Sequence, residues 1–425
     1  MTREPIRTSD QAVAFLLSLV RDDPRPYQAR ANLAQLPIRR LLARIGDPQI
    51  DLPAVHIAGS KGKGSTALYL EAILQAAGMR TGTFTSPHLQ RWTERLRIDG
   101  RESTDAEFAA LFARLQPHVL ALQAEDDACA PSFFDVLTAA ALLLFAERRV
   151  ECAIIEAGIG GRLDATNVVQ PVLTCITSVE LEHTDKLGDS IAAIAGEKAG
   201  IIKQGIPVIV GTLPPEAEAV IRRRGAELHG QVEVAGDPAD GIAHLAATDR
   251  CSARNANMAV ACARRIAGDR EGFSKAVDQA LTHTRPPGRM EVIAEHPWVV
   301  IDGAHTRASS AALAEMLQSV PANRLHLLVS VTIAKDASAV LAPLLERADS
   351  VVITNADATR SMDGDAVAAS LVAHGYNPAR IRAIADPRQA VLQSRDALAD
   401  DDVLCVAGSM YMAGVARETL LGARA

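Results

Sequence analysis

The chain has 425 residues and a mass of 45.0 kDa, which is long enough for two or three domains that each bury a core. Its 48% hydrophobic and 22% charged residues exclude a disordered, fibrous or disulfide-stapled protein. The formal net charge of -7, with no long basic block, argues against nucleic acid as a main partner.

Cysteine usage and the N-terminal sequence indicate the compartment. The six cysteines lie far apart and form no CxxC pair, as is typical of proteins in a reducing compartment. The start of the chain, MTREPIRTSDQAV, lacks the apolar segment of a signal peptide. The longest strongly apolar run, residues 136–146, is shorter than the ~20 residues of a membrane helix. We therefore expect a cytoplasmic protein that has no membrane span.

Short β-branched segments alternate with longer Ala- and Leu-rich segments at helical spacing, which predicts an α/β fold with mainly parallel sheets flanked by helices. The first series of strands is expected at residues 54–58, 82–85, 152–156, 172–177 and 207–210. The second series is expected at residues 298–302, 326–330, 351–354, 380–385 and 403–407. Helices between the strands include residues 65–77, 133–147, 308–317 and 387–398.

The run Arg285-Pro286-Pro287-Gly288 separates the two series, because its prolines stop a helix and its glycine permits a turn. We place the domain boundary there, with a large first domain at residues 1–286 and a smaller, Rossmann-like α/β domain at residues 287–425. Residues 211–250 have weaker patterning and are interpreted as a partly β insertion or edge region.

A glycine-rich segment, Gly59-Ser60-Lys61-Gly62-Lys63-Gly64-Ser65-Thr66, lies between the first predicted strand and a helix. Unhindered backbone N–H groups and a helix N-terminus in this order form a phosphate site. Lys63 would neutralise the β- and γ-phosphates of a nucleotide, and Ser65 or Thr66 could bind Mg²⁺. The usual Walker spacing is not met, because Ile57 stands where its first glycine belongs. A purely structural turn is the weaker alternative.

This variant loop resembles the ATP-binding loop of the Mur ligase superfamily, and its setting resembles the folylpolyglutamate synthase and dihydrofolate synthase branch. Further blocks similar to that branch follow in order: Thr85-Ser86-Pro87-His88-Leu89, Thr93-Glu94-Arg95, Glu156-Ala157-Gly158-Ile159-Gly160-Gly161-Arg162-Leu163-Asp164-Ala165-Thr166-Asn167, Glu182-His183-Thr184-Asp185 and Gly196-Glu197-Lys198-Ala199-Gly200-Ile201. The resemblance implies a large ATP-binding domain followed by an amino-acid-binding ligase domain.

Carboxylate and lysine positions suggest a metal site. Glu156 ends a buried apolar strand, where an unpaired carboxylate is costly, so a cation on the nucleotide phosphates would suit it. The alternative is that Glu156 caps a neighbouring loop or forms a salt bridge with it. The resemblance implies that Ser86 and Glu156 hold a first Mg²⁺, while His183 and Lys198 belong to a second. It also implies a carbamylated Lys198. The alternatives are that His183 is a hydrogen-bonded histidine at a strand end and that Lys198 is a solvated surface charge.

Two further segments have weaker signals. Asp164 and Asn167 offer polar groups to the reacting centre, although an Asx-rich turn would explain them equally. Phe134 lies in a segment that resembles the part of relatives near the pterin substrate, and core packing is its alternative.

In the second part of the chain, the resemblance implies that Asn255, Arg289 and Asp302 contact the nucleotide, and that His305 and Ser409 lie near the incoming amino acid. Asn255 could instead cap a helix, and Arg289 could form an interdomain salt bridge. The chain departs from the family pattern at Thr306, which replaces an asparagine, and at Ala334, which replaces an aspartate.

Together these residues predict an ATP-dependent carboxylate–amine ligase that uses Mg²⁺, and the resemblance implies two Mg²⁺ positions. Its catalytic residues would be Lys63, Glu156, His183, Lys198 and His305. The resemblance implies that L-glutamate is joined to dihydropteroate or a reduced folate. We expect a monomer that acts on these small molecules. The alternatives are an amide ligase for another acid or amino acid, and a P-loop kinase or nucleotide switch.

Overall fold

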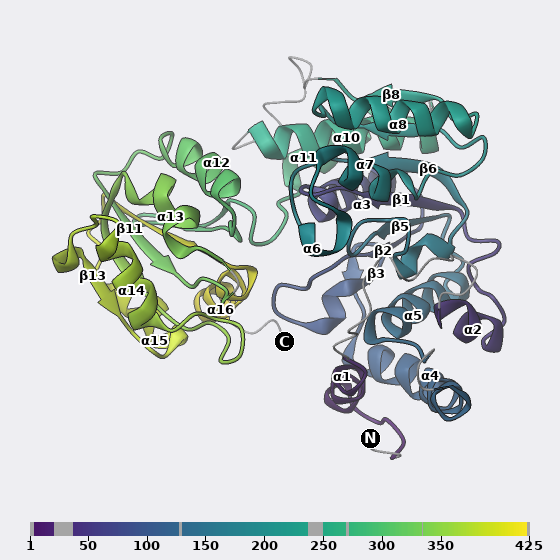
Figure 1. Ribbon diagram of the computed structural model, residues 1–425, viewed down its shortest axis with the longest axis horizontal. Helices are drawn as coiled ribbons and strands as arrows, with labels where there is room; N and C mark the ends of the chain where they lie inside the picture. Colours follow the sequence, from purple (N-terminus) through teal and green to yellow (C-terminus); the bar gives the residue numbers. More distant parts are fainter. Residues whose placement is uncertain are drawn as a thin grey trace. The chain divides into compact units, whose positions relative to one another are not determined.

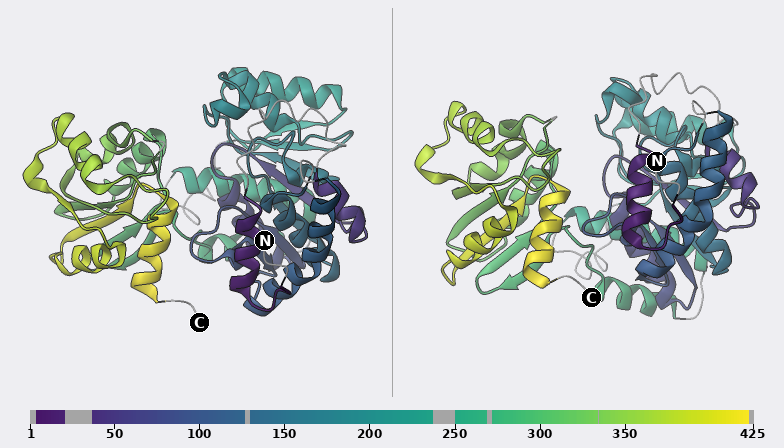
Figure 2. Two further views of the ribbon diagram at one scale, coloured as in Figure 1. Left: turned by 60° about the horizontal axis from the view of Figure 1, so that its bottom comes forward. Right: turned by 90° about the horizontal axis from the view of Figure 1, so that it is seen from below.

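The computed structural model describes residues 4–20, 37–126, 130–236, 250–268, 272–333 and 335–422, and it divides into two compact units (Figure 1). The first unit comprises Met1–His88 and Trp92–Thr284, and the second comprises Leu89–Arg91 and Arg285–Ala425. Each unit is an α/β structure built on its own sheet (Figure 2). Ala334 lies outside the described residues.

The first unit contains an eight-stranded sheet in the order β4-β3-β2-β5-β1-β6-β7-β8. Its strands are β1 (Ala54–Ala58), β2 (Thr81–Phe84), β3 (Leu96–Ile98), β4 (Arg101–Glu102), β5 (Cys152–Glu156), β6 (Pro171–Ile176), β7 (Val208–Val210) and β8 (Val232–Val234). The six neighbouring strands β2, β5, β1, β6, β7 and β8 pair in parallel. The strands β3 and β4 extend the sheet beyond β2 by antiparallel pairing. The predicted parallel sheet is therefore confirmed, with one antiparallel extension.

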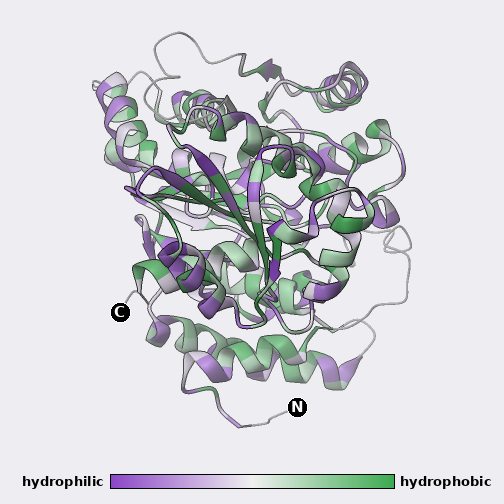
Figure 3. Cartoon of the chain, turned by 90° about the vertical axis from the view of Figure 1, so that its left-hand side faces the viewer, coloured by the Kyte–Doolittle hydropathy of each residue, from purple (hydrophilic) through white to green (hydrophobic). Residues whose placement is uncertain are grey.

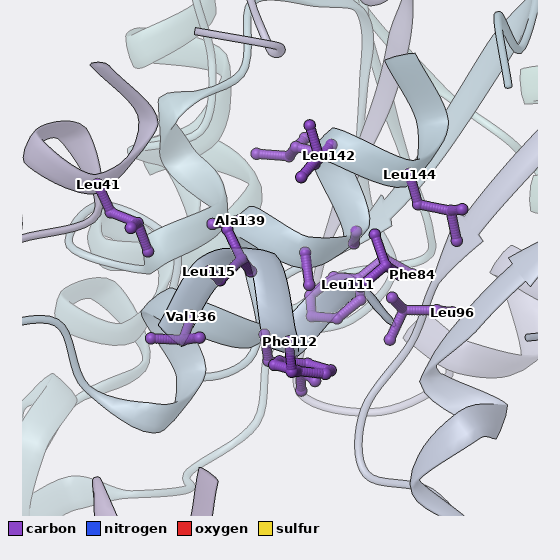
Figure 4. Close-up of a cluster of buried hydrophobic side chains, with 14 of the residues drawn as sticks. Leu41, Phe84, Leu96, Leu111, Phe112, Leu115, Val136, Ala139, Leu142 and Leu144 are labelled. Atoms are coloured by element: carbon purple, nitrogen blue, oxygen red, sulfur yellow. The ribbon is translucent and has the colours of Figure 1, made fainter. Parts of the chain in front are cut away.

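Helices cover the first sheet on both faces. They are α1 (Ser9–Ser18), α2 (Pro37–Arg44), α3 (Lys63–Ala76), α4 (Asp105–Glu125), α5 (Phe133–Glu147), α6 (Thr184–Leu187), α7 (Ile191–Ala199), α8 (Pro215–Glu227), α10 (Arg250–Ala267) and α11 (Phe273–His283), with short 3-10 turns at Trp92–Arg95 and Ala165–Val168. One core joins α1, α2, α4 and α5 to the sheet through large side chains such as Phe84, Phe112 and Leu142 (Figure 4). A second core joins α3, α10 and α11 to β1, β5 and β6.

The second unit contains a six-stranded sheet in the order β13-β12-β11-β14-β10-β9, parallel except for the β9 and β10 pair. Its strands are β9 (Glu291–Glu295), β10 (Trp298–Ile301), β11 (Arg324–Val329), β12 (Ala348–Ile353), β13 (Ile381–Ala383) and β14 (Asp402–Ala407). Its helices are α12 (Arg307–Leu317), α13 (Ala337–Leu345), α14 (Gly364–Ala373), α15 (Pro387–Asp396) and α16 (Met410–Leu421), with a 3-10 turn at Pro378–Arg380. Strands and helices alike carry hydrophobic and hydrophilic residues (Figure 3).

The structure describes part of the region with weaker patterning. It contains α8 and the edge strand β8, which pairs parallel to β7, while residues 237–249 lie outside the described part of the chain. No helix among the described residues is both long and apolar enough to cross a membrane.

Two glycines give a paired prediction about stability. A Cβ at Gly82 on β2 would lie 2.6 Å from the Phe145 ring, whereas nothing lies within 4 Å of a Cβ at Gly196 inside α7. We expect Gly82→Ala to lower the free energy of unfolding by about 1–3 kcal/mol through overpacking. Gly196→Ala should raise it by about 0.5–1 kcal/mol, because alanine favours the helix. Denaturant titrations would measure both changes. Equal changes in the free energy of unfolding of the two variants would contradict the close packing of Gly82 against Phe145.

Candidate active site

The glycine-rich segment follows β1 and leads directly into α3, which begins at Lys63, two residues before the predicted start. Gly62 adopts a left-handed conformation with φ 82°, and no side chain caps the first N–H groups of the helix. The loop is held to the end of β6, since the Ser60 and Lys61 N–H groups donate to Ser178 O and Oγ at 2.9 and 2.8 Å. The uncapped helix start is suited to binding an anion.

Asn255 on α10 lies directly against this loop. A Cβ at Gly62 would be 2.2 Å from Asn255 Oδ1, so a glycine is required there. Because α10 begins at Arg250, Asn255 lies inside the helix, and the alternative that it caps the helix is wrong. Lys63 Nζ, on the other side of the loop, donates to the Gly59 carbonyl at 2.8 Å.

Glu156 lies beside the start of α3. The register pairs it with Ile57, one residue before the end of β1, so the carboxyl ends of β1 and β5 bring the loop and the carboxylate together. Glu156 is buried, and its Oε2 accepts a hydrogen bond from the Ser86 N–H at 2.9 Å. The same oxygen would be 3.3 Å from a Cβ at Gly64. Ser86, Gly64 and Glu156 therefore meet at one point.

This donor set fits a magnesium ion that is shared with a nucleotide. Mg²⁺ is usually held by one or two carboxylates together with substrate phosphates and water. Glu156 provides a carboxylate, and the buried Thr66 Oγ1 has no hydrogen-bond partner among the described residues. No group of three or more His, Cys, Asp and Glu side chains within the described ranges could hold a metal by itself. A phosphate would have to complete the coordination.

Lys198 is buried in α7 and contacts Glu182, so the alternative of a solvated lysine is wrong. Its side chain is 1% exposed, and Nζ lies 2.8 Å from Glu182 Oε1. Burial lowers the pKa of Lys198 to about 8 despite the opposing charge of Glu182. Sequence reasoning missed Glu182, whose position beside His183 in the LEHTD segment was the available signal.

His183 itself has a left-handed backbone conformation with φ 45° at the start of α6. Burial lowers the pKa of the half-buried imidazole, so its neutral form is favoured. A neutral imidazole is the form that binds metals.

The loop after β5 is organised by Asp164. One carboxylate oxygen accepts from the Gly158 and Ile159 N–H groups at 3.0 and 3.1 Å, and the other accepts from Thr166 N and Oγ1 at 3.0 and 2.5 Å. Asn167 Nδ2 donates to Arg162 O and Gly200 O, which ties the loop to the end of α7. These contacts support the Asx-turn alternative, and a contact of Asp164 with substrate stays a prediction.

Phe134 packs on the same loop. Its ring centroid lies 5.8 Å from that of Phe84, and a Cβ at Gly158 would be 2.8 Å from Phe134 Cζ. The half-buried ring therefore helps to shape the surface near Glu156. Its contact with a pterin stays a prediction.

A buried histidine supports this loop and gives a pH prediction. His56 Nε2 donates to Thr166 Oγ1 at 2.8 Å, since that hydroxyl already donates to Asp164. Burial lowers the pKa of His56 to about 3. Below pH 6.5 the unfolded chain binds a proton that the folded chain excludes, so stability falls as the pH drops toward 3. We expect His56→Gln to reduce this loss, by up to about 1.4 kcal/mol per pH unit, in melts between pH 7 and 5. An unchanged pH dependence would contradict the assignment.

The second unit gathers its predicted residues where β10 and β14 end. Asp302 accepts hydrogen bonds from Met290 N and Ala304 N at 2.9 and 2.7 Å. His305 Nδ1 donates to the Gly303 carbonyl at 2.8 Å, and a Cβ at Gly303 would be 3.2 Å from Arg289 Nη1. The Gly408 N–H donates to Ala304 O at 2.8 Å.

Two residues with hydroxyl side chains, Ser409 and Thr306, cap the N-termini of helices at this edge. Ser409 Oγ accepts from Met412 N at 3.1 Å and caps α16. Thr306 caps α12 and forms a capping box with Ser309. Threonine and asparagine are both favoured as helix caps, so either residue could cap α12 at this position.

Comparison with known proteins identifies the second unit and the whole chain. Residues 288–410 match the family described as Mur ligase, glutamate ligase domain. The dihydrofolate synthase/folylpolyglutamate synthase of Mycobacterium tuberculosis is 33% identical, with 98% of this chain and 96% of that protein covered. A Haloferax volcanii protein named probable bifunctional folylpolyglutamate synthase/dihydropteroate synthase is 33% identical over 96% of this chain. The chain spans about half the length of that relative, since it covers 50% of it.

Solved structures agree with these sequence relatives. The M. tuberculosis folylpolyglutamate synthase complexed with ADP has a TM-score of 0.87 and 30% identity, covering 98% of both chains. A bifunctional Yersinia pestis enzyme complexed with AMPPNP and Mn ion has a TM-score of 0.84 and 28% identity, covering 99% of this chain and 100% of that one. The resemblance stated from the sequence is therefore confirmed, and the chain belongs to the folylpolyglutamate synthase/dihydrofolate synthase family of Mur ligases.

Proposed function

We propose that this protein uses ATP to join L-glutamate to the carboxylate of dihydropteroate or of a reduced folate. The observation that carries the proposal is the buried Glu156 carboxylate, which lies against Gly64 and Ser86 at the start of α3. A helix start suited to a phosphate and a carboxylate suited to Mg²⁺ thus lie next to each other. Relatives with these names and a nucleotide complex support the assignment.

In this reaction the residues of the first unit act on the phosphates. The uncapped N–H groups of α3 and the Lys63 ammonium would hold the γ-phosphate for in-line attack by the acceptor carboxylate. The bond from the γ-phosphorus to the bridging oxygen breaks, ADP leaves, and an acyl phosphate forms. The amine of glutamate then displaces inorganic phosphate and forms the amide.

We propose two magnesium positions in the first unit. Glu156 and Ser86, with a hydroxyl of Ser65 or Thr66, would hold the first ion, while His183 and Lys198 would serve the second. Bound Mg²⁺ would neutralise the phosphate charge that develops during transfer. Lys198 could join such a site as a carbamate, which would turn its buried ammonium into a carboxylate-like ligand. A ¹³C carbamate signal from enzyme in labelled bicarbonate, absent in Lys198→Arg, would test this.

In the second unit, Arg289 and Asp302 would contact the nucleotide, and His305 and Ser409 would receive glutamate. We expect His305→Ala to raise the KM for glutamate about tenfold, with little change in the KM for ATP, because one hydrogen bond to the amino acid is lost. Steady-state kinetics with each substrate varied in turn would measure both constants. A selective rise in the KM for ATP would reverse the assignment of this edge.

We further propose that the protein acts in the cytoplasm, as a monomer, on small molecules. Four cysteines among the described residues are buried and free: Cys152, Cys175, Cys262 and Cys405. Free buried thiols fit a reducing compartment.

The decisive experiment measures ADP release and amide formation with dihydropteroate or tetrahydrofolate plus L-glutamate, against a panel of other acids and amines. A glutamylated folate identified by mass would support the proposal. Turnover only with another acid or amino acid would establish a different Mur-type ligase. A phosphorylated product, or phosphate release without an acceptor, would indicate a kinase or a nucleotide switch.

A further inference from the structure

A short segment of the first half of the chain is built into the second unit. Leu89–Arg91 belongs to the second unit, although His88 before it and Trp92 after it belong to the first. The backbone therefore passes between the units on both sides of this segment, in addition to the boundary between Thr284 and Arg285. Ser86, which contacts Glu156, lies only three residues before Leu89.

Two glycines of the second unit lie against Leu89: Gly414 on α16 faces its backbone, and Gly288 faces its side chain. A Cβ at Gly414 would lie 2.0 Å from the Leu89 carbonyl oxygen, so the helix and the segment touch without an intervening side chain. A Cβ at Gly288 would lie 3.0 Å from Leu89 Cδ1. The leucine also packs on the hydrophobic cluster that contains Met412 and Ala413. Leu89 is thus fixed to the second unit by backbone contact and by burial.

A buried arginine joins the segment to the domain linker. Arg417 on α16 is 5% exposed, and its Nη1 donates to Gln90 Oε1 at 2.6 Å. Its Nε donates to Glu291 Oε1 at 2.8 Å, and Glu291 Oε2 accepts from the Gly288 N–H at 2.8 Å. A buried guanidinium is stable only when its donors are satisfied, so this network is under strong constraint. The segment and the start of the second unit after the linker are thus both hydrogen-bonded to the group around Arg417.

The stretch from His88 to Gln90, which we call the tether, is too short to absorb a movement of the second unit. Arg95 Nε donates to His88 Nδ1 at 2.8 Å and anchors His88 in the first unit, whereas Gln90 is anchored in the second. Two residues of fully extended chain span at most about 7 Å. A rotation of the second unit that displaced Leu89 by more than a few ångströms would therefore pull on Pro87 and Ser86.

We propose that Arg417 is a positioning residue, which couples the orientation of the second unit to the contact between Ser86 and Glu156. The coupling runs from Arg417 through Gln90 and Leu89 to the Ser86 N–H. Its effect on the reaction rests on the proposed function, whereas the mechanical link does not. Ser86 would then be placed for catalysis only when the second unit holds the segment.

The test compares Gln90→Leu with Gln90→Glu. Leucine removes the acceptor for Arg417, while glutamate keeps it and adds a charge that strengthens the bond. We expect Gln90→Leu to speed hydrogen exchange of the amides at residues 86–91 about tenfold and to lower kcat about tenfold, with the KM for ATP unchanged. Gln90→Glu should keep exchange and kcat near the parent values. Arg388→Gln, which removes the exposed Arg388–Glu418 pair of α15 and α16, is the control and should alter neither.

The two readouts separate the inference from the proposed function. Unchanged exchange in Gln90→Leu, or equal losses in Gln90→Leu and Gln90→Glu, would overturn the tether. Faster exchange with an unchanged kcat would overturn the positioning role. If the parent protein ligates glutamate to no folate, the proposed function fails, yet faster exchange in Gln90→Leu alone still supports the mechanical link.

Discussion

Replacing Lys63 by alanine should lower kcat for ligation about 100- to 1000-fold while the protein remains folded. The ammonium lies at the start of α3 and donates to the Gly59 carbonyl, so its removal disturbs one half-buried loop contact, and Lys63 is not part of the hydrophobic core. Its role as the positive charge on the transferred phosphate is not supplied by any uncharged side chain. ADP release under saturating substrates would measure the loss, and a thermal melt would check the fold.

The matched control is Lys275→Ala on α11, which removes one exposed lysine of the same unit that has no proposed role in the reaction. It should keep parent activity. Activity of Lys63→Ala within a factor of about three of the control would refute the phosphate role, because a lost charge contact of this kind costs more.

Glu156→Gln should lower kcat about 100-fold or more and weaken the binding of a divalent ion in the presence of nucleotide. The glutamine retains an oxygen that can accept from the Ser86 N–H, so the loop geometry is preserved while the negative charge is lost. A metal that completes its shell with one carboxylate depends strongly on that charge. Titration of Mn²⁺ with AMPPNP, followed by electron paramagnetic resonance, gives a readout that is independent of turnover.

Glu227→Gln provides the control, since this glutamate forms an exposed pair with Arg224 on α8 and has no role in the proposed site. Parent-like Mn²⁺ affinity in Glu156→Gln would rule out the carboxylate as a ligand. Reduced affinity in both variants alike would point to a general effect of charge on the protein.

The buried strands could be predicted because their sequence is almost wholly apolar. β1 and β5 have the predicted bounds, since each is buried on both faces and appears as a continuous hydrophobic run. β9 was missed because it is a half-exposed antiparallel edge, and its residues Glu291–Glu295 alternate without a strong apolar face. β3 and β4 were missed because three and two residues are too short for a pattern.

The candidate site was predictable where a residue type and a local motif coincide. Lys63 and Glu156 lie next to turns whose chemistry is visible in the sequence, and the structure places their segments together. The pairs that depend on distant segments could not be derived this way. The contact of His56 with Thr166 joins residues 110 positions apart, and the approach of Asn255 to Gly62 requires α10 to be already packed on α3.

The close approach of Asn255 to Gly62 also limits how this enzyme could be re-engineered. A loop transplanted from another nucleotide-binding protein would bring a side chain into a space that the Asn255 amide already fills. Such a graft would need to carry the facing turn of α10 with it, so these two stretches form a single exchangeable module.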